Sequence, residues 1–276
     1  MLATILIVFR EVIEAGLIVG IVLAATMGVP RRGIWVGYGI AAGIAGACIV
    51  AGFAGQLAAL FEGSGQEIFN AGILILAVAM LTWHNVWMAS HGRAMAQEMR
   101  AVGAAVAAGR RPLVALSVVV GIAVLREGSE VVLFLYGIAA SGGITAYTLL
   151  IGGLLGVLAG AGVSALMYLG LLTIPAHRLF AATSGLITLL AAGLAAQAVA
   201  FIQQAGYAEL LTGTVWNTSW LLSDDSLAGR LFHTLIGYTD QPSGAQLVVY
   251  LGTVVAIVTL MRLVTSRKPI RRAIPT

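Results

Sequence analysis

The sequence has few charged residues and a single cysteine. Only 9% of its 276 residues are charged, whereas roughly a quarter are charged in an average soluble domain. Cys48 alone excludes an intramolecular disulfide and a cysteine-cluster metal site, and its apolar surroundings suggest a packed side chain. Hydrophobic residues make up 60% of the chain. This composition excludes an ordinary soluble domain and predicts an all-α integral membrane protein.

Long apolar runs account for most of the chain. About 20 apolar residues cross a bilayer core as a helix, and seven runs reach that length. The 35 glycines and the scarcity of alternating stretches favour packed helices over a β-barrel. Because Arg10, Glu11 and Glu14 interrupt the first run, we expect it to be kept as a span and not cleaved as a signal peptide. The predicted spans are 2–26, 34–60, 67–89, 113–140, 146–172, 179–203 and 245–263.

The basic residues predict the orientation of these spans. Of the fifteen Lys and Arg, twelve lie in alternate loops, Arg10 and Arg126 lie within spans, and Arg230 alone lies on the opposite side. The positive-inside rule then places the N-terminus outside and the C-terminus in the cytoplasm, which predicts a multi-pass protein of the cytoplasmic membrane. The twelve are Arg31, Arg32, Arg93, Arg100, Arg110, Arg111, Arg178, Arg262, Arg267, Lys268, Arg271 and Arg272.

An internal repeat divides the predicted domain, residues 1–276. FREVIEAGLIVGI (9–21) resembles LREGSEVVLFLYGI (125–138), with Arg, Glu and Glu in register 116 residues apart. Each motif opens a unit of three spans, so the second unit enters the membrane from the opposite side, as in the inverted repeats of many transporters. We therefore predict repeat one at about 1–89, a cytoplasmic connector at about 90–111 that is a separate helix or a helical extension, repeat two at about 113–203, an external loop at about 204–244, and a seventh span outside the repeat.

Glycines in the second and fifth predicted spans suggest how the halves pack. Gly39 and Gly43 in one span, and Gly152, Gly156 and Gly160 in the other, follow small-xxx-small spacing. Such spacing lets two helix backbones approach closely in a membrane. We expect these faces to join the two halves.

Charged residues within the spans are the main functional signal. Each costs roughly 2.5–3.5 kcal/mol at a helix centre, so they must pair, titrate or face a polar cavity. Arg10 and Glu14, like Arg126 and Glu130, are four residues apart and share a helix face. Two ion pairs that merely lock helices would need neither Glu11 nor Glu127. Four carboxylates and two guanidiniums carry a formal charge of −2, so the motifs predict a midplane cation site whose oxygen ligands favour harder metals.

Together these residues resemble a known family. REVIE (10–14) and REGSE (126–130) are similar to the paired REXXE motifs of the oxidase-dependent iron permeases, and FEG…QE (61–67) is similar to another family element. The resemblance implies iron uptake, with Glu11, Glu14, Glu127 and Glu130 contacting iron and Arg10 and Arg126 balancing charge. It implies no permanently bound cofactor, with iron as the substrate. It also implies a separate iron oxidase or periplasmic iron-binding protein as partner, because this chain lacks a copper- or haem-ligand set.

Other functions use the same glutamates. Some relatives are linked to lead, so a permease for another divalent metal, such as lead or manganese, stays open. So does a membrane protein that translocates protons through these carboxylates. The sequence contains no P-loop and no HExxH, and a single histidine within a span does not suit paired haem ligation. We therefore do not expect an enzyme.

Two further positions near the third span have weaker signals. The resemblance of FEGSGQE suggests Glu67 as an entry ligand for the metal, although an interfacial, solvated carboxylate is the simpler interpretation. His84 and Met88 are one helical turn apart and would suit a metal relay. Because the predicted span ends there, we favour an interfacial aromatic belt with Trp83 and Trp87.

The predicted external loop contains two adjacent aspartates. Asp224 and Asp225 would suit metal capture, but they follow Ser223 and precede an apolar helical pattern. We interpret Ser223 as the N-cap of a short helix and the aspartates as partners of the positive end of its dipole.

Overall fold

The fold consists of helices. A computed structural model describes residues 1–59, 66–140, 145–171, 176–224 and 226–266. Among these residues the secondary structure is helical apart from an isolated bridge between Thr214 and Ser243, which agrees with the predicted all-α class. The helices are α1 (Leu2–Ala25), α2 (Arg32–Ala59), α3 (Gln66–Ala107), α4 (Val114–Ala140), α5 (Ala146–Tyr168), α6 (Ala176–Gln204), α7 (Leu227–Ile236) and α8 (Gly244–Ser266).

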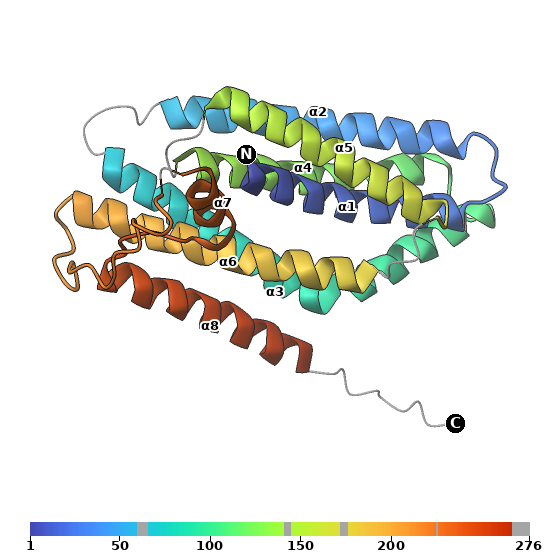
Figure 1. The fold of residues 1–276 in the computed structure, drawn as a ribbon. Helices are drawn as coiled ribbons and strands as arrows, with labels where there is room; N and C mark the ends of the chain where they lie inside the picture. The colour runs from blue at the N-terminus through green and yellow to red at the C-terminus, as the bar shows by residue number, and fades with distance from the viewer. Residues whose placement is uncertain (60–65, 141–144, 172–175, 225, 267–276) are drawn as a thin grey trace.

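The long helices form layers. Consecutive long helices run in opposite directions, so α1 and α4 are antiparallel (Figure 1). α1 and α4 pack together in the middle of the molecule, with α2 against α4 and α5 against α1. α3 and α6 form the next layer, and α8 covers both. This arrangement buries the charged residues of α1 and the Glu127 face of α4, whereas Ile122 of α4 is exposed (63%).

Five helices in the described residues are long and apolar enough to cross a membrane. They also expose large apolar side chains, for example Ile49 (74%) on α2 and Leu150 (74%) on α5, as expected of surfaces that face lipid. The chain is therefore a multi-pass membrane protein. α1 and α4 have similar lengths, 24 and 27 residues, but each carries three charges near its middle. The five stretches are Arg32–Ala54, Glu67–Gly92, Ala146–Tyr168, Phe180–Gln204 and Gly244–Ser266.

Two helices differ from their predicted form. α3 continues without interruption to Ala107, so the start of the connector is a helical extension and the residues around 84 lie well inside the helix. The N-cap of α7 is Ser226, whose side chain accepts a hydrogen bond from the Gly229 amide at 2.9 Å, so the predicted cap at Ser223 is wrong. The cap lies three residues later than predicted, and the Asp224 carboxylate accepts a hydrogen bond from the Asp240 amide instead.

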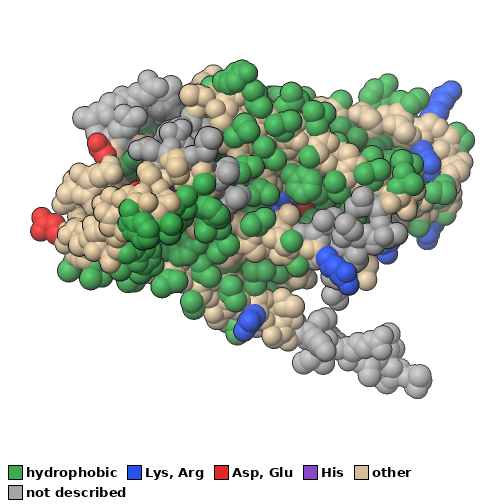
Figure 2. All heavy atoms as spheres, viewed as in Figure 1, with side chains coloured by type: hydrophobic (Ala, Val, Ile, Leu, Met, Phe, Trp, Pro, Cys, Tyr) green, Lys and Arg blue, Asp and Glu red, His purple; other side chains and the backbone are tan. Residues whose placement is uncertain are grey.

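Basic residues gather at one end of the molecule. Arg31 lies between α1 and α2, and Arg32 is the first residue of α2. Arg110 and Arg111 lie between α3 and α4, and Arg262 lies near the end of α8. Because the helices alternate in direction, these positions share one end. Figure 2 shows Lys and Arg side chains toward that end and acidic side chains at the end that holds the N-terminus. We refer to these as the basic end and the acidic end.

Glycines allow the close helix contacts that the spacing predicts. A Cβ added to Gly156 of α5 would lie 2.8 Å from Cβ of Val8 and 2.9 Å from the carbonyl oxygen of Ile5, both on α1. A Cβ added to Gly43 of α2 would lie 2.8 Å from the carbonyl oxygen of Gly121 on α4. Neither site has room for a side chain, so the α5–α1 and α2–α4 contacts depend on these glycines.

We expect Gly156→Val to destabilise the fold by about 1–3 kcal/mol, the usual effect of overpacking. Gly162→Val, on the exposed side of the same helix where an added Cβ meets nothing within 4 Å, is the matched control. Thermal unfolding of both purified variants in detergent measures the effect. Equal midpoints for the two variants would contradict the inferred packing.

Candidate metal centre

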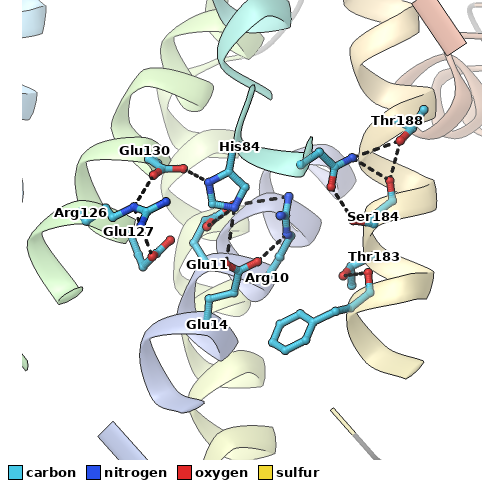
Figure 3. Close-up of polar contacts among 12 residues, drawn as sticks. Arg10, Glu11, Glu14, His84, Arg126, Glu127, Glu130, Thr183, Ser184 and Thr188 are labelled. Carbon is cyan, nitrogen blue, oxygen red and sulfur yellow. Dashed lines mark hydrogen bonds and ion pairs between the residues drawn. The ribbon is translucent and has the colours of Figure 1, made fainter. Parts of the chain in front are cut away.

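Three helices bring charged side chains together at mid-depth. Arg10, Glu11 and Glu14 come from the middle of α1, and Arg126, Glu127 and Glu130 come from the middle of α4 (Figure 3). His84 of α3 lies between the two motifs (Figure 3). Glu11 and Glu127 are 1% and 2% exposed, and His84 is 2% exposed. The six predicted motif residues therefore form one cluster together with a histidine, and within it the Arg126 side chain is partly exposed (33%).

Each arginine pairs with the glutamate one turn away, as the four-residue spacing predicts. Nε of Arg10 donates to Oε1 of Glu14 at 2.8 Å, and Nε of Arg126 donates to Oε1 of Glu130 at 3.1 Å. Cζ of Arg126 also lies 4.0 Å from the ring centre of Trp87, a cation–π contact. The arginines thus hold one oxygen each of Glu14 and Glu130, and they lie 3.9 Å from Glu11 and Glu127 without donating a hydrogen bond to either.

Four potential ligand atoms converge in the cluster. One atom each from Glu11, His84, Glu127 and Glu130 lies within 4.8 Å of the other three. Both oxygens of Glu11 and of Glu127 are buried and accept no hydrogen bond. Nearly all buried polar atoms in proteins have a partner, so a group of orphans requires an explanation. A bound cation would supply one, because it would contact the unpaired atoms together.

The predicted interfacial position of His84 is wrong, because the side chain is buried in the cluster. We placed it in an interfacial aromatic belt because the apolar run ends near residue 89, but α3 continues and His84 packs edge-on against Phe134, 6.4 Å between ring centres. Its Nδ1 contacts Oε2 of Glu130, and its Nε2 lies 3.8 Å from Glu11 and 3.5 Å from Glu14. A signal was available, because an ionisable side chain inside a span is itself a marker of function.

Asn85 holds this part of α3 against α6. Its side-chain amide donates to the hydroxyl of Thr188 at 3.1 Å and to the carbonyl of Ser184 at 3.2 Å, and it accepts from the Ser184 hydroxyl. Asn85 is 1% exposed. Because buried polar contacts fix the rotation of a helix about its axis, this group directs the adjacent His84 toward α1 and α4 (Figure 3).

The other predicted residues lie elsewhere. Glu67 is exposed in the first turn of α3, about 25 Å along the helix from His84 at 1.5 Å per residue. Its role as an entry ligand stays a prediction. Residues 61–65 and Asp225 lie outside the described part of the chain. Asp224 accepts from the Asp240 amide at 3.2 Å, and burial raises the pKa of its carboxyl.

A cavity leads from the cluster to the basic end. It has a volume of about 1040 Å³, and Arg10 and Glu14 lie at its inner end, while Arg262 lies at the other. Met88, Met95 and the hydroxyl of Thr188 also line it. α1, α3, α6 and α8 form its walls. The cluster therefore has a route toward the basic end.

Toward the acidic end the cluster is covered by apolar side chains. Ile7 and Leu74 precede the charged residues on α1 and α3, whereas Phe134 and Ile138 follow them on α4. Since α4 runs opposite to α1 and α3, all four lie on the acidic-end side. Ile187 of α6 belongs to the same group of buried apolar residues. We call Ile7, Leu74, Phe134, Ile138 and Ile187 the apolar plug.

Known proteins resemble this chain over most of its length. The Iron permease FTR1 family matches residues 1–269, a range that includes all eight helices and both motifs. The ferrous iron permease EfeU of Escherichia coli O6:H1 is 31% identical over 249 residues, 89% of this chain and 89% of the relative. The ferrous iron permease EfeU of Yersinia pestis is 32% identical over 252 residues, 89% of this chain and 87% of the relative. No solved structure matches the chain.

The cluster predicts opposite effects of two substitutions on the metal-free protein. Glu127→Gln should stabilise it by about 1–3 kcal/mol, because it replaces a buried carboxylate that accepts no hydrogen bond and lies close to Glu11 with a neutral amide. Arg10→Met should destabilise it by about 3–5 kcal/mol, because it leaves the buried Glu14 carboxylate without its arginine partner. Thermal unfolding in the presence of a chelator measures both. If Glu127→Gln lowers the unfolding midpoint as much as Arg10→Met does, the inferred destabilising effect of the Glu127 carboxylate is contradicted.

Proposed function

The chain belongs to the Iron permease FTR1 family, and from this premise we propose that it carries iron ions into the cell through the cluster between α1 and α4. The family and its bacterial relatives are permeases, which supports transport of iron across a membrane as opposed to an enzymatic reaction. Iron is then the transported substrate and no resident cofactor is needed. The ligands are Glu11, Glu14, Glu127 and Glu130, with Arg10 and Arg126 as the charge-balancing residues.

The buried, unpaired carboxylates are the observation that carries this proposal. Oxygens of Glu11 and Glu127 lie close together and accept no hydrogen bond, which is unfavourable until a cation arrives. With histidine neutral, the formal charge of −2 is balanced by one divalent ion. A site that is unstable when empty and neutral when filled suits an ion that must both enter and leave.

The helix arrangement supports a transporter made of two inverted repeats. α1 to α3 and α4 to α6 form the repeats and α8 is the seventh span. α1 and α4 run in opposite directions, and the α2–α4 contact has its counterpart in the α5–α1 contact. In such transporters the site lies at the midplane where the repeats meet. The domain boundaries predicted from the sequence stand as part of this proposal.

The basic end faces the cytoplasm in this proposal. Positively charged loops stay inside, so the N-terminus and the loop around α7 are external, in the cytoplasmic membrane of the cell. The cavity of about 1040 Å³ then opens inward, and the apolar plug closes the outer side. The arrangement corresponds to the inward-facing state of alternating access, in which an ion released by the glutamates leaves toward the cytoplasm.

Iron must reach the cluster from outside in a usable form. Glu67, exposed at the acidic end of α3, suits a first contact for the ion. A separate iron oxidase or periplasmic iron-binding protein would deliver it. Both assignments follow the family resemblance and are part of the proposal.

Uptake of radiolabelled iron by reconstituted vesicles tests the function. Glu14→Ala and Glu130→Ala should each reduce uptake about tenfold or more, since losing 1.4 kcal/mol of binding already gives that factor. Glu98→Ala removes an exposed carboxylate of α3 far from the cluster and is the matched control. Normal uptake by either well-incorporated cluster variant would contradict the proposed site.

Competition in the same vesicles separates the alternatives. Excess lead or manganese should leave most iron uptake intact if iron is the preferred substrate. Stronger uptake of either metal would identify a permease for another divalent ion. Proton flux without metal that disappears in Glu14→Ala would identify proton translocation instead.

The inward cavity predicts a blocking substitution. Gly185 lines the cavity, and an added Cβ there meets nothing within 4 Å, so Gly185→Leu should fill the route without disturbing the packing. We expect a lower maximal uptake rate, with iron affinity changed by less than about a factor of two. Gly162→Leu, on the exposed face of α5, should transport normally. Wild-type rates for Gly185→Leu would exclude this exit route.

A further inference from the structure

His84 is the member of the cluster that neither charged motif supplies. It comes from α3 and is 2% exposed. Its Nδ1 contacts Oε2 of Glu130, and its Nε2 lies 3.5 Å from Glu14, so both ring nitrogens face carboxylates of the two motifs. Ser184 and Thr188 of α6 accept hydrogen bonds from the adjacent Asn85 and so fix the rotation of α3 about its axis. The imidazole is therefore directed into the cluster by a dedicated contact.

The position of His84 is that of a ligand. Its ring nitrogens lie between the motifs, with Nδ1 against Glu130 and Nε2 3.8 Å from Glu11. The four ligand atoms within 4.8 Å of one another include His84 and exclude Glu14. Glu14 is held by Arg10 at 2.8 Å. The imidazole thus stands in the cluster where symmetry between the motifs would have placed a fourth carboxylate.

The spacing alone does not select a metal. Ligands on opposite sides of a transition-metal ion lie about 4.2 Å apart at bonds of about 2.1 Å, whereas Ca²⁺, with bonds of 2.3–2.6 Å, separates them by about 5 Å. Four ligand atoms that lie within 4.8 Å of one another can reach either separation with small side-chain movements. Selection must therefore come from the chemistry of the donors.

One nitrogen changes that chemistry. Carboxylate oxygens suit Mg²⁺, Ca²⁺ and Mn²⁺, whereas imidazole suits Fe, Ni, Cu and Zn. With three carboxylates and one imidazole, the set gains affinity for borderline ions relative to hard ones. A neutral imidazole also adds a ligand without adding negative charge, so a divalent ion still balances the site.

We propose that His84 is a direct ligand of the transported ion and makes the site prefer Fe²⁺ over the hard divalent ions Mn²⁺, Mg²⁺ and Ca²⁺. This assignment rests on the proposed function. It corrects the oxygen-only site expected from the sequence. If His84 only bridged the two motifs electrostatically, its loss would weaken binding of every divalent ion equally.

Binding of Fe²⁺ and Mn²⁺ to the purified full-length chain without oxygen tests the proposal. We compare wild type, His84→Asn, and His91→Asn as the matched control, because His91 lies on the same helix but is exposed and stacked on Trp87. His84→Asn should weaken Fe²⁺ binding about tenfold or more and Mn²⁺ binding much less. The Fe²⁺/Mn²⁺ preference should therefore fall about tenfold, and His91→Asn should leave it unchanged.

X-ray absorption at the iron edge gives a second readout that needs no variant. Imidazole coordination produces outer-shell scattering, which we expect in wild type and His91→Asn and not in His84→Asn. Iron-loaded wild type without this scattering would overturn the proposal even if His84→Asn failed to fold. An unchanged Fe²⁺/Mn²⁺ preference in folded His84→Asn would also overturn it.

Glu127→Ala separates this proposal from the proposed function. If wild type binds Fe²⁺ and Glu127→Ala does not, the carboxylate site stands, and the result for His84 is decided by the two readouts above. If wild type shows no saturable Fe²⁺ binding, the proposed function fails and the role of His84 fails with it.

Discussion

The structure depends on keeping six charges in the middle of an apolar helix bundle. Every such charge is expensive in lipid, and the bundle meets the difficulty in two ways. Arg10 and Arg126 each neutralise one glutamate of their own helix. Glu11 and Glu127 accept no hydrogen bond and lie close together, so a cation bound between them would be stabilised. The fold tolerates this because neighbouring helices bury Arg10, Glu11, Glu14 and Glu127.

The close packing of glycine faces makes this enclosure possible. α2 lies against α4 and α5 lies against α1 at backbone distance, so the outer sides of both motif helices are covered without large side chains. The third side is covered by α3 and α6, which Asn85 joins. The same contact orients His84, so the residue that completes the cluster is held by the packing that encloses it.

The cluster lies at a boundary between closed and open halves of the molecule. Apolar side chains fill the space between it and the acidic end, and a cavity connects it to the basic end. A site reached from one side at a time is the arrangement that alternating access requires. The antiparallel α1 and α4 give the bundle two comparable halves, so a complementary packing with the opposite end open is a natural counterpart.

Sequence periodicity and charge spacing determined the helical class, the bounds of the long helices to within a few residues except for the end of α3, and the pairing of each arginine with its glutamate, because these features depend on contacts four residues apart or on apolar length. They also identified the glycine faces. They did not determine that one atom each of Glu11, Glu127, Glu130 and His84 lies within 4.8 Å of the others. That depends on the rotation of α3 against α6 and on how three helices meet, which no local pattern encodes. An apolar run ending near residue 89 suggested an interface at His84, and only the tertiary structure, with α3 continuing to Ala107, placed that imidazole at the centre.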